Sequence, residues 1–384
     1  MDVKSDLTNT SKEFRLMLDL LNLEKGSPEL FNNESFLSSI DWEAFLKLSH
    51  DHRVFPLLHV AIQKQKNISL PTDVVKALRD SYVKNTMRMM ELTAEVERVC
   101  KVFQQMNIQA LLLKGPALAY QLYRNLSSRT SMDLDFLISI ENLDKVTMIL
   151  QDLGYEIAYE SPRVLKDWRV NNHHTEFYHK EKKIEIELHW KLHSGPSHEP
   201  TFEEMWREKV LIPITSTPMY TLGNEHMLYH LVTHGAKHGW FRLRWLTDIE
   251  QLLCTQNFDL TKTIAKYHYQ HVFGQTILLL QLLLHIPIDS TQKISRKSQL
   301  LAENAFQYIR YQIDIDHPPQ KWKKDCKRYR YNIKTSSEKR NYLIRKFYAN
   351  SWDAKILPLP KLLHFLYVPL RPFIWLWRMT RKPS

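Results

Sequence analysis

The sequence predicts an α+β fold in which a small mixed-sheet core lies between helical N-terminal and C-terminal regions. The chain has only 8 glycines among its 384 residues, so sandwiches and barrels with many tight turns are disfavoured. Long segments without Gly or Pro, such as residues 72–106, favour helices. Residues 107–190 instead alternate between short apolar runs and short helical segments, which is typical of an α/β unit.

Changes in sequence pattern divide the chain into four regions. A chain of this length exceeds one typical domain. We expect a helical N-terminal region over residues 1–106, an α/β core over 107–192, a helical domain over 193–315 that completes a cleft, and a basic and apolar C-terminal region over 316–384.

The N-terminal region is expected to consist of helices. Residues 10–66 hold two or three amphipathic helices, one of which has Asp41 as its N-cap. Pro71 is suited to open a long helix that runs from Thr72 to about Met106. Its methionines and aromatic residues recur mostly every three or four positions, which indicates packing in a core.

The core is expected to alternate strands and helices. The predicted strands cover residues 108–113, 133–138, 155–159, 174–179 and 182–190, the last two joined by a turn at 180–182. Helices are predicted at 116–123 and 141–153, and Gly154 caps the second. Further helices are predicted after the core, over residues 223–238, 242–256, 259–285 and 293–312.

Three carboxylates of the core are candidate metal ligands. Asp133 and Asp135 are separated by one residue on a predicted strand, so both side chains point to the same side. Alternation over residues 183–190 places Glu187 on the polar face of another strand. If the two strands are neighbours, the three carboxylates can hold Mg²⁺ or Mn²⁺. Such an ion neutralises a triphosphate and activates an attacking oxygen.

Lys114 and Gly115 form a candidate anion site. They lie at the turn between a predicted strand and a helix start, where free backbone N–H groups attract anions. Gly115 allows the backbone to approach a ligand closely. A surface lysine near a turn is the alternative interpretation of Lys114.

The order of these motifs resembles that of a known family. The matching pieces run from residue 114 to residue 248 and are Lys114-Gly115, Ala117-Leu118, Arg129, Asp133-Leu134-Asp135, Glu187-Leu188-His189-Trp190, His234 with His238, and Arg242-Leu243-Arg244-Trp245-Leu246 to Asp248. The set resembles the nucleotidyltransferase superfamily of DNA polymerase beta-like fold. It is more closely similar to a bacterial nucleotidyltransferase-like family with Lys-Gly in place of the usual Gly-Ser.

The resemblance implies an Mg²⁺- or Mn²⁺-dependent enzyme. Such an enzyme moves a nucleoside monophosphate from a nucleoside triphosphate to an acceptor, which here could be a small molecule, a peptide or RNA. The resemblance makes Asp133, Asp135 and Glu187 the catalytic metal ligands. It also implies residues that bind the nucleotide, namely Lys114, Gly115, Arg129, Lys237 and Arg244.

Two departures from the superfamily leave other functions open. Lys114-Gly115 replaces the usual Gly-Ser, and Glu187 stands where Asp is common. The chain could therefore be a non-catalytic nucleotide-binding or regulatory module of the same fold. Its basic composition suggests a third interpretation, a toxin-like transferase that acts on tRNA.

Two features of the helical domain also have alternatives. His226, His230, His234 and His238 are spaced by four, which is a zinc spacing, but histidines that line the cleft or a helix surface are favoured. Arg244 and Asp248 are also four apart. They form either a simple helix salt bridge or a phosphate-binding arginine oriented by its carboxylate partner.

The charge of the chain favours anionic partners. The net charge is +11 and the pI about 9.3. Residues 321–346 are basic and aromatic, which indicates either a solvated helix face or a patch for RNA, phosphate or lipid headgroups. The apolar residues 357–384 are interpreted as folded onto the helical core, with peripheral membrane contact as the alternative.

Other classes of protein lack their signatures here. The 3 cysteines are far apart and form no CxxC pair, which is typical of a reducing compartment. Neither a signal peptide nor an apolar run of about 18 residues is found, so a cytoplasmic location is expected. Serine-hydrolase, dehydrogenase, kinase and P-loop motifs are not found.

Overall fold

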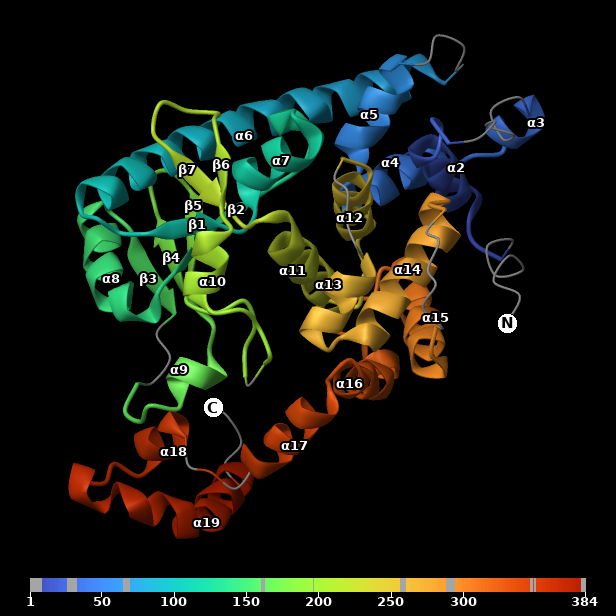
Figure 1. Cartoon of the computed structure of the whole chain (residues 1–384). Helices are drawn as coiled ribbons and strands as arrows, with labels where there is room; N and C mark the ends of the chain where they lie inside the picture. Colours follow the sequence, from blue (N-terminus) through green and yellow to red (C-terminus); the bar gives the residue numbers. More distant parts are fainter. Residues whose placement is uncertain are drawn as a thin grey trace.

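The computed structural model describes residues 9–25, 33–64, 70–159, 163–195, 197–255, 260–287, 294–345, 348 and 350–380. It shows an α+β fold in which a seven-stranded mixed sheet is flanked by helices (Figure 1). The expected fold class is confirmed.

The sheet has the strand order β3-β4-β5-β2-β1-β7-β6. Its strands are β1 (Ala110–Leu112), β2 (Asp133–Ile138), β3 (Glu156–Tyr159), β4 (His174–His179), β5 (Ile184–His189), β6 (Val210–Ile212) and β7 (Met219–Thr221). Two pairs, β2 with β5 and β1 with β7, are parallel, and the other four are antiparallel. The predicted turn at residues 180–182 joins β4 to β5.

One face of the sheet is covered by two helices. Leu134 and Phe136 of β2 share a buried cluster with Leu92 of α6 (Thr72–Gln105) and Val146 of α8 (Leu143–Asp152). Because side chains alternate along a strand, Asp133 and Asp135 point to the opposite face. Two short 3-10 helices, η2 (Leu126–Ser128) and η3 (Ile140–Asn142), flank β2, and Gly154 caps α8 with φ +89°.

The other helices fall into two groups along the chain. In the N-terminal region they are α2 (Lys12–Leu21), α3 (Glu34–Leu37), α4 (Trp42–Asp51) and α5 (Phe55–Lys64). From the core onward they are α7 (Gly115–Tyr123), α9 (Trp168–Asn171), α10 (Phe202–Arg207), α11 (Asn224–Lys237), α12 (Arg244–Thr255), α13 (Leu260–Tyr267), α14 (Gln270–Leu284) and α15 (Arg296–Arg310). Asp41 caps α4 through its side chain, as expected.

The N-terminal helices and the downstream helices share one hydrophobic core. Leu16 of α2, Phe45 of α4, Leu243 before α12 and Leu283 of α14 belong to the same buried cluster. The side chain of Asn22 donates to the carbonyl of Leu283 at 2.9 Å, which ties the end of α2 to α14. The helices before α6 therefore form one body with the downstream helices.

The structure differs from the expectations after residue 192. The expected helical domain over 193–315 contributes two strands, β6 and β7, and the latter extends the sheet beside β1. The single helix predicted over 259–285 is wrong, because α13 and α14 are separated at His268, which has φ +57°. Residues 256–259 lie outside the described part of the chain.

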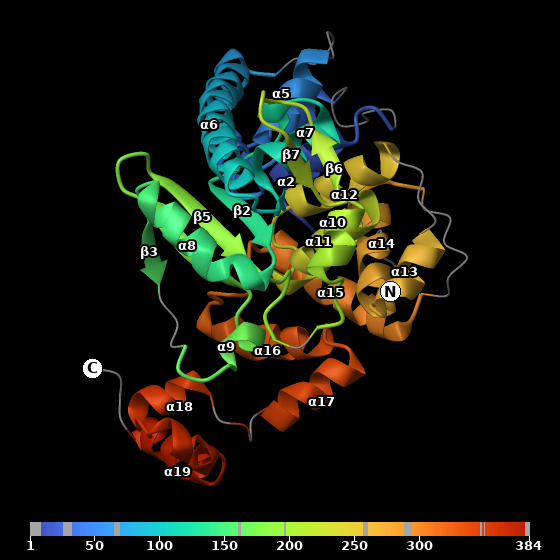
Figure 2. The ribbon, with the colours of Figure 1, turned by 60° about the vertical axis from the view of Figure 1, so that its left-hand side comes forward.

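The C-terminal region begins at the main buried cluster, to which Cys326 and Tyr329 belong, and ends in an arm of short helices below the sheet (Figures 1 and 2). It comprises η4 (Gln320–Trp322), α16 (Lys323–Asn332), α17 (Ser336–Arg345), α18 (Ser351–Ile356), η5 (Lys361–Leu366) and α19 (Tyr367–Thr380). The hypothesis that residues 357–384 fold onto the helical core is wrong for the described part. Tyr367 and Ile374 form a separate small cluster, and Leu362 and Phe373 are 89% and 70% exposed.

Within the described residues, none of the helices combines the length and apolar character needed to cross a bilayer.

Candidate active site

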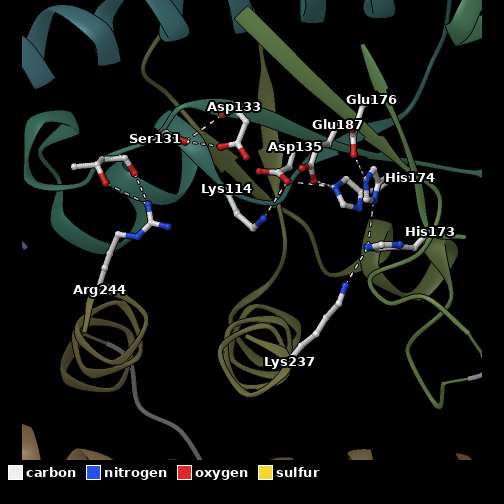
Figure 3. Close-up of polar contacts among 12 residues, drawn as sticks. Lys114, Ser131, Asp133, Asp135, His173, His174, Glu176, Glu187, Lys237 and Arg244 are labelled. Carbon is white, nitrogen blue, oxygen red and sulfur yellow. Dashed lines mark hydrogen bonds and ion pairs between the residues drawn. The ribbon is translucent and has the colours of Figure 1, made fainter. Parts of the chain in front are cut away.

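The carboxylates predicted from the sequence meet on the polar face of the sheet (Figure 3). Asp133 and Asp135 lie on β2, and β5 runs parallel beside it with Glu187 directly opposite Asp135. The condition set by the sequence, that the two strands be neighbours, is therefore met. The neighbouring pair in the same register is Asp133 with Glu185.

Asp135 is the most enclosed of these carboxylates. Its side chain is fully buried, and its Oδ1 accepts a hydrogen bond from Lys114 Nζ at 3.0 Å. His189 Nε2 lies 3.2 Å from the same oxygen. Burial acts to raise the pKa of Asp135, but Lys114 and His189 outweigh it and lower the pKa. Within the described residues, Oδ2 of Asp135 has no hydrogen-bond partner, so one oxygen is available to a ligand.

Glu187 is joined to Asp135 through His189. His189 Nε2 lies 3.0 Å from Glu187 Oε2, so one ring nitrogen bridges two carboxylates. Burial acts to raise the pKa of Glu187, but the bond to His189 and the charges around it lower the pKa well below its usual range. The pKa of buried His189 is raised, because the two carboxylates outweigh the effect of burial. Glu187 is therefore ionised at neutral pH.

Asp133 occupies the outer end of the carboxylate row. Ser131 Oγ lies 3.4 Å from its Oδ1 and donates to its backbone oxygen at 3.1 Å. The carboxylate on the adjacent strand, Glu185, differs from Glu187, since burial and the charges of nearby carboxylates raise the pKa of Glu185. Asp133 and Glu187 thus lie on either side of Asp135.

The donor set fits a hard divalent cation. Oxygen atoms of Asp135 and Glu187 and a ring nitrogen of His189 all lie within 4.8 Å of one another. Carboxylate oxygens suit Mg²⁺ and Mn²⁺, and the unpartnered Oδ2 of buried Asp135 is a free donor beside them. Asp133 is the additional carboxylate on the same face.

The Lys114-Gly115 turn lies directly beside this row. Gly115 begins α7 with φ +69°, a conformation that side chains disfavour. The free N–H groups of the first turn of α7 therefore lie next to Lys114, as the sequence predicted. Burial acts to lower the pKa of Lys114, but Asp135, Glu187 and Asp133 raise it, so the side chain is a charged ammonium.

Arg129 and Arg244 lie apart from the carboxylates. Arg129 Nε donates to Asp248 Oδ2 at 3.0 Å, and the two side chains are 1% and 0% exposed. Asp248 also accepts from the hydroxyl of Tyr123 at 3.0 Å. The expected role of Arg129 as a triphosphate ligand is therefore corrected, because its side chain is buried in an ion pair that holds the loop before β2.

Arg244 supports the same loop. Its Nη1 donates to the carbonyl oxygen of Thr130 at 2.6 Å and to the hydroxyl of the same residue at 3.3 Å. The predicted pairing of Arg244 with Asp248 is replaced by the Arg129–Asp248 pair. A direct contact of Arg244 with phosphate is not supported, since the side chain is buried and its guanidinium group is already bonded to Thr130.

The charge of Asp133 acts on two other arginines. Arg53 lies in the turn between α4 and α5, and Arg242 lies just before α12. Burial and the charge of Arg242 lower the pKa of Arg53 to about 10, while Asp133 acts to raise it. Burial also lowers the pKa of Arg242, and the charges of Asp314, Asp133 and Asp51 oppose this effect. Arg53 and Arg242 repel one another, so a polyanion that neutralises both of them would be favoured here.

A chain of histidines lies on the Glu187 side and was not predicted as part of the site. On β4, His174 and Glu176 lie opposite His189 and Glu187. His174 Nε2 lies 3.2 Å from Glu176, and its Nδ1 lies 3.1 Å from Nε2 of His173.

Lys237 joins this chain from the last turn of α11. Its Nζ donates to Nε2 of His173 at 3.2 Å (Figure 3), so Lys237 is linked to the site through a histidine, and its role as a nucleotide ligand stays a prediction. Burial lowers the pKa of Lys237, and the charge of Lys114 adds to the effect.

The sequence contained a signal for His189, because it shares a strand face with Glu187. Alternation also placed His174 and Glu176 on one face of their strand.

The histidine stripe of α11 is not a metal site. His226 bonds to the hydroxyl of Tyr267 at 2.7 Å, and His238 bonds to Asp316 at 2.7 Å. Burial lowers the pKa of His230 and of His234 well below the usual value, so both rings are neutral. Among the described residues, the groups able to hold a metal ion do not include this stripe.

Carboxylates on a mixed sheet, next to a lysine at a helix N-terminus, define a site of the nucleotidyltransferase class. The chain belongs to the family of uncharacterised nucleotidyltransferases, whose sequence model matches residues 38–285. This match begins before Arg53 and includes all the candidate site residues named above.

Comparison with other proteins adds two distant structural likenesses. A search of curated proteins finds no significant match. The antibiotic-resistance factor ANT(2'')-Ia is 11% identical, covers 52% of this chain and 98% of its own, and has a TM-score of 0.35. A nucleotidyltransferase-like protein from Paracoccidioides brasiliensis is 13% identical, with 52% and 95% coverage and a TM-score of 0.33. The family assignment rests on the sequence match.

Proposed function

We propose that this protein transfers a nucleoside monophosphate from a nucleoside triphosphate to an acceptor hydroxyl, with Mg²⁺ or Mn²⁺ as cofactor. The observation that carries the proposal is the parallel register that sets Glu187 opposite Asp135 beside Lys114. Within our proposal the chain is a DNA polymerase beta-like nucleotidyltransferase with Lys-Gly in place of Gly-Ser.

Asp133, Asp135 and Glu187 would hold the cation. When bound, it supplies positive charge to the phosphates and lowers the pKa of an acceptor hydroxyl. The three carboxylates supply the charge that balances it. His189 positions two of them, since its Nε2 bridges Asp135 and Glu187.

The triphosphate would lie at the Asp133 end of the row. The first turn of α7 offers backbone N–H groups, and Lys114 supplies a buried ammonium. Arg53 and Arg242 replace Arg129 and Arg244 as the arginines suited to phosphate, because they are only partly buried and lie near Asp133.

The acceptor would approach from the Glu187 side. The lowered pKa keeps the carboxylate of Glu187 ionised but makes it a weak base on its own. Glu187 can take the proton of the acceptor hydroxyl because the pKa of that hydroxyl is lowered when a cation is bound. The acceptor oxygen forms a bond to the α-phosphorus, and the bond to the β-phosphate oxygen breaks. Pyrophosphate leaves with the displaced electron pair.

Transfer of isotope label tests this proposal. ATP labelled at the α- or the γ-phosphate is incubated with the protein, Mg²⁺ and cell extract, and the other nucleoside triphosphates are tried in turn. We expect label from the α-phosphate in a new product and label from the γ-phosphate in pyrophosphate. Transfer of the γ-phosphate to the product would contradict the proposal.

A nucleotide-binding module without transfer is the second candidate. It is favoured by one observation, the ion pair of Lys114 with Asp135, which neutralises a carboxylate that the enzyme needs for metal. This candidate predicts nucleotide binding by calorimetry together with no transfer of label from any position. Calorimetry and label transfer, measured on the same preparation of protein, thus distinguish the two candidate functions.

A further inference from the structure

A large cavity lies on the Glu187 side of the carboxylate row. Its volume is about 980 Å³, and it is lined by residues of α11, α14, α16, α17 and the loop after β5. Ala236, Tyr269 and Val272 are buried side chains of its inner wall. A volume of this size fits a small molecule with a partly apolar body.

The cavity is strongly cationic. Its lining includes six lysines and arginines, namely Lys237, Lys324, Lys327, Arg328, Arg330 and Lys334, against two acidic residues. Both acidic residues are already engaged. Asp316 is bonded by His238 and Arg330, and Glu338 accepts from the hydroxyl of Tyr269 and the backbone N–H of Thr335.

Two of the cations have no protein partner. In the described part of the chain, Lys324 and Lys327 make no hydrogen bond or ion pair, although Arg328 beside them is bonded to Asp325. Both lysines are exposed and lie on α16, within the basic stretch 321–346. Like charges gathered around one hollow repel one another unless an anion enters it.

The cavity is connected to the catalytic carboxylates by Lys237. This side chain lines the cavity and also donates to His173, which leads through His174 to Glu176 and His189. Arg53 and Arg242, in contrast, lie at the Asp133 end of the row. The two groups of cations therefore flank the carboxylates on opposite sides, which suits two different anions.

We propose that this cavity binds the acceptor, and that the acceptor is a small molecule that carries a hydroxyl group and at least one phosphate or carboxylate group. The inference rests on the proposed function, because it takes the Asp133 end as the triphosphate site. A cavity of about 980 Å³ is of the size that holds one small molecule, which favours a small anion over a folded RNA.

Phosphate binding tests the cavity directly. The protein is first saturated with Mg²⁺ and a non-hydrolysable ATP analogue, and inorganic phosphate is then titrated by calorimetry. The double variant Lys324→Ala and Lys327→Ala should weaken phosphate binding about tenfold, which corresponds to about 1.4 kcal/mol. The matched control, Lys321→Ala with Lys323→Ala, removes the same charge from exposed residues outside the cavity and should leave phosphate affinity unchanged.

The results separate this inference from the proposed function. If the ATP analogue fails to bind wild-type protein, the proposed function is wrong, and phosphate is titrated without it to judge the cavity. Equal phosphate affinity in both double variants would overturn the cavity inference whatever the nucleotide result. A short RNA that displaces phosphate through the same two lysines would also overturn it, in favour of a nucleic acid acceptor.

Transfer of α-label supplies a second readout. Small molecules from cell extract are separated into anionic and neutral fractions on an anion-exchange resin. We expect acceptor activity in the anionic fraction, and the double cavity variant should raise the KM for that fraction with little change in kcat. Acceptor activity confined to the neutral fraction would contradict the inference.

Discussion

Asp135 of β2 lies directly opposite Glu187 of β5 in a parallel strand pair, and His189 Nε2 bridges their carboxylates. In a parallel pair of strands the side chains of opposed residues point to the same face. The two strands are separated in sequence by α8, β3, α9 and β4, so Asp135 and Glu187 meet only in the folded protein. The arrangement gives a compact donor set at the centre of the polar face.

Glu187 and Glu185 offer a matched pair of substitutions. Both lie on the same face of β5, but only Glu187 is opposite Asp135 and bonded to His189. Glu187→Gln should lower the rate of nucleotidyl transfer by more than about a hundredfold. Loss of a residue that only hydrogen-bonds a metal ligand typically costs about 10- to 100-fold, and loss of a ligand itself should cost more. Glu185→Gln should cost less than about tenfold. Steady-state kinetics that show the larger loss in Glu185→Gln would contradict this assignment.

The Arg129–Asp248 pair should matter for stability. Because both side chains are buried, Arg129→Ala leaves an uncompensated charge and should lower the free energy of unfolding by about 3–5 kcal/mol. Lys47→Ala removes one partner of an exposed pair with Asp51 and should cost less than about 1 kcal/mol. Urea unfolding measures both. Similar small losses in the two variants would indicate that Arg129 is free to bind phosphate.

Glu95 should make stability depend on pH. Burial acts to raise the pKa of Glu95, but hydrogen bonds from Arg98, Lys182 and Tyr155 lower the pKa from 4.5 to about 2. The ionised group therefore stabilises the fold fully above pH 4.5, and this contribution is lost as the pH falls toward 2.

Glu95→Gln should lower the free energy of unfolding by about 2 kcal/mol at pH 7, the size expected for hydrogen bonds to a charged group. The difference from wild type should shrink between pH 4.5 and pH 2 in chemical unfolding. Glu91→Gln, at a side chain that is 63% exposed on the same helix, serves as the control. A wild-type advantage that stays constant over this pH range would refute the role given to Glu95.

Removal of residues 359–384 tests the C-terminal arm. Because Tyr367 and Ile374 pack in a cluster separate from the main core, the melting temperature should fall by less than about 4 °C. Phe373 and Trp375 are exposed, so we expect the full chain to bind anionic vesicles and the shortened chain to lose this binding. A large fall in melting temperature, or vesicle binding that survives the deletion, would contradict this expectation.

The strands and carboxylates of the core were predictable because their signals are local. Alternation of apolar and acidic residues marks β2 and β5, and it also fixes which side chains share a face. The three-residue strands β6 and β7 are too short to show a period of two. The break between α13 and α14 lies at His268, where neither Gly nor Pro marks it.

The partners of the arginines were not predictable, because tertiary packing decides them. Spacing by four suggested Arg244 as the partner of Asp248, but the partner is Arg129, which is 119 residues away. The charge of Asp133 acts on Arg53, which lies in a turn of the N-terminal helices, and a single arginine there carries no local signal. The exposed C-terminal arm was not predicted for a similar reason. An apolar sequence does not show whether the folded protein has a surface that can bury it.

Nucleotide-dependent binding of Mn²⁺ tests the central claim most directly. Electron paramagnetic resonance follows free Mn²⁺ during titration with protein and a non-hydrolysable ATP analogue. Asp135→Asn should weaken this binding at least about tenfold, because it removes a charge that the cation must balance. Asp144→Asn, at a side chain that is 94% exposed, should bind as the wild type does. Wild-type Mn²⁺ affinity in folded Asp135→Asn would contradict the assignment of these carboxylates as metal ligands.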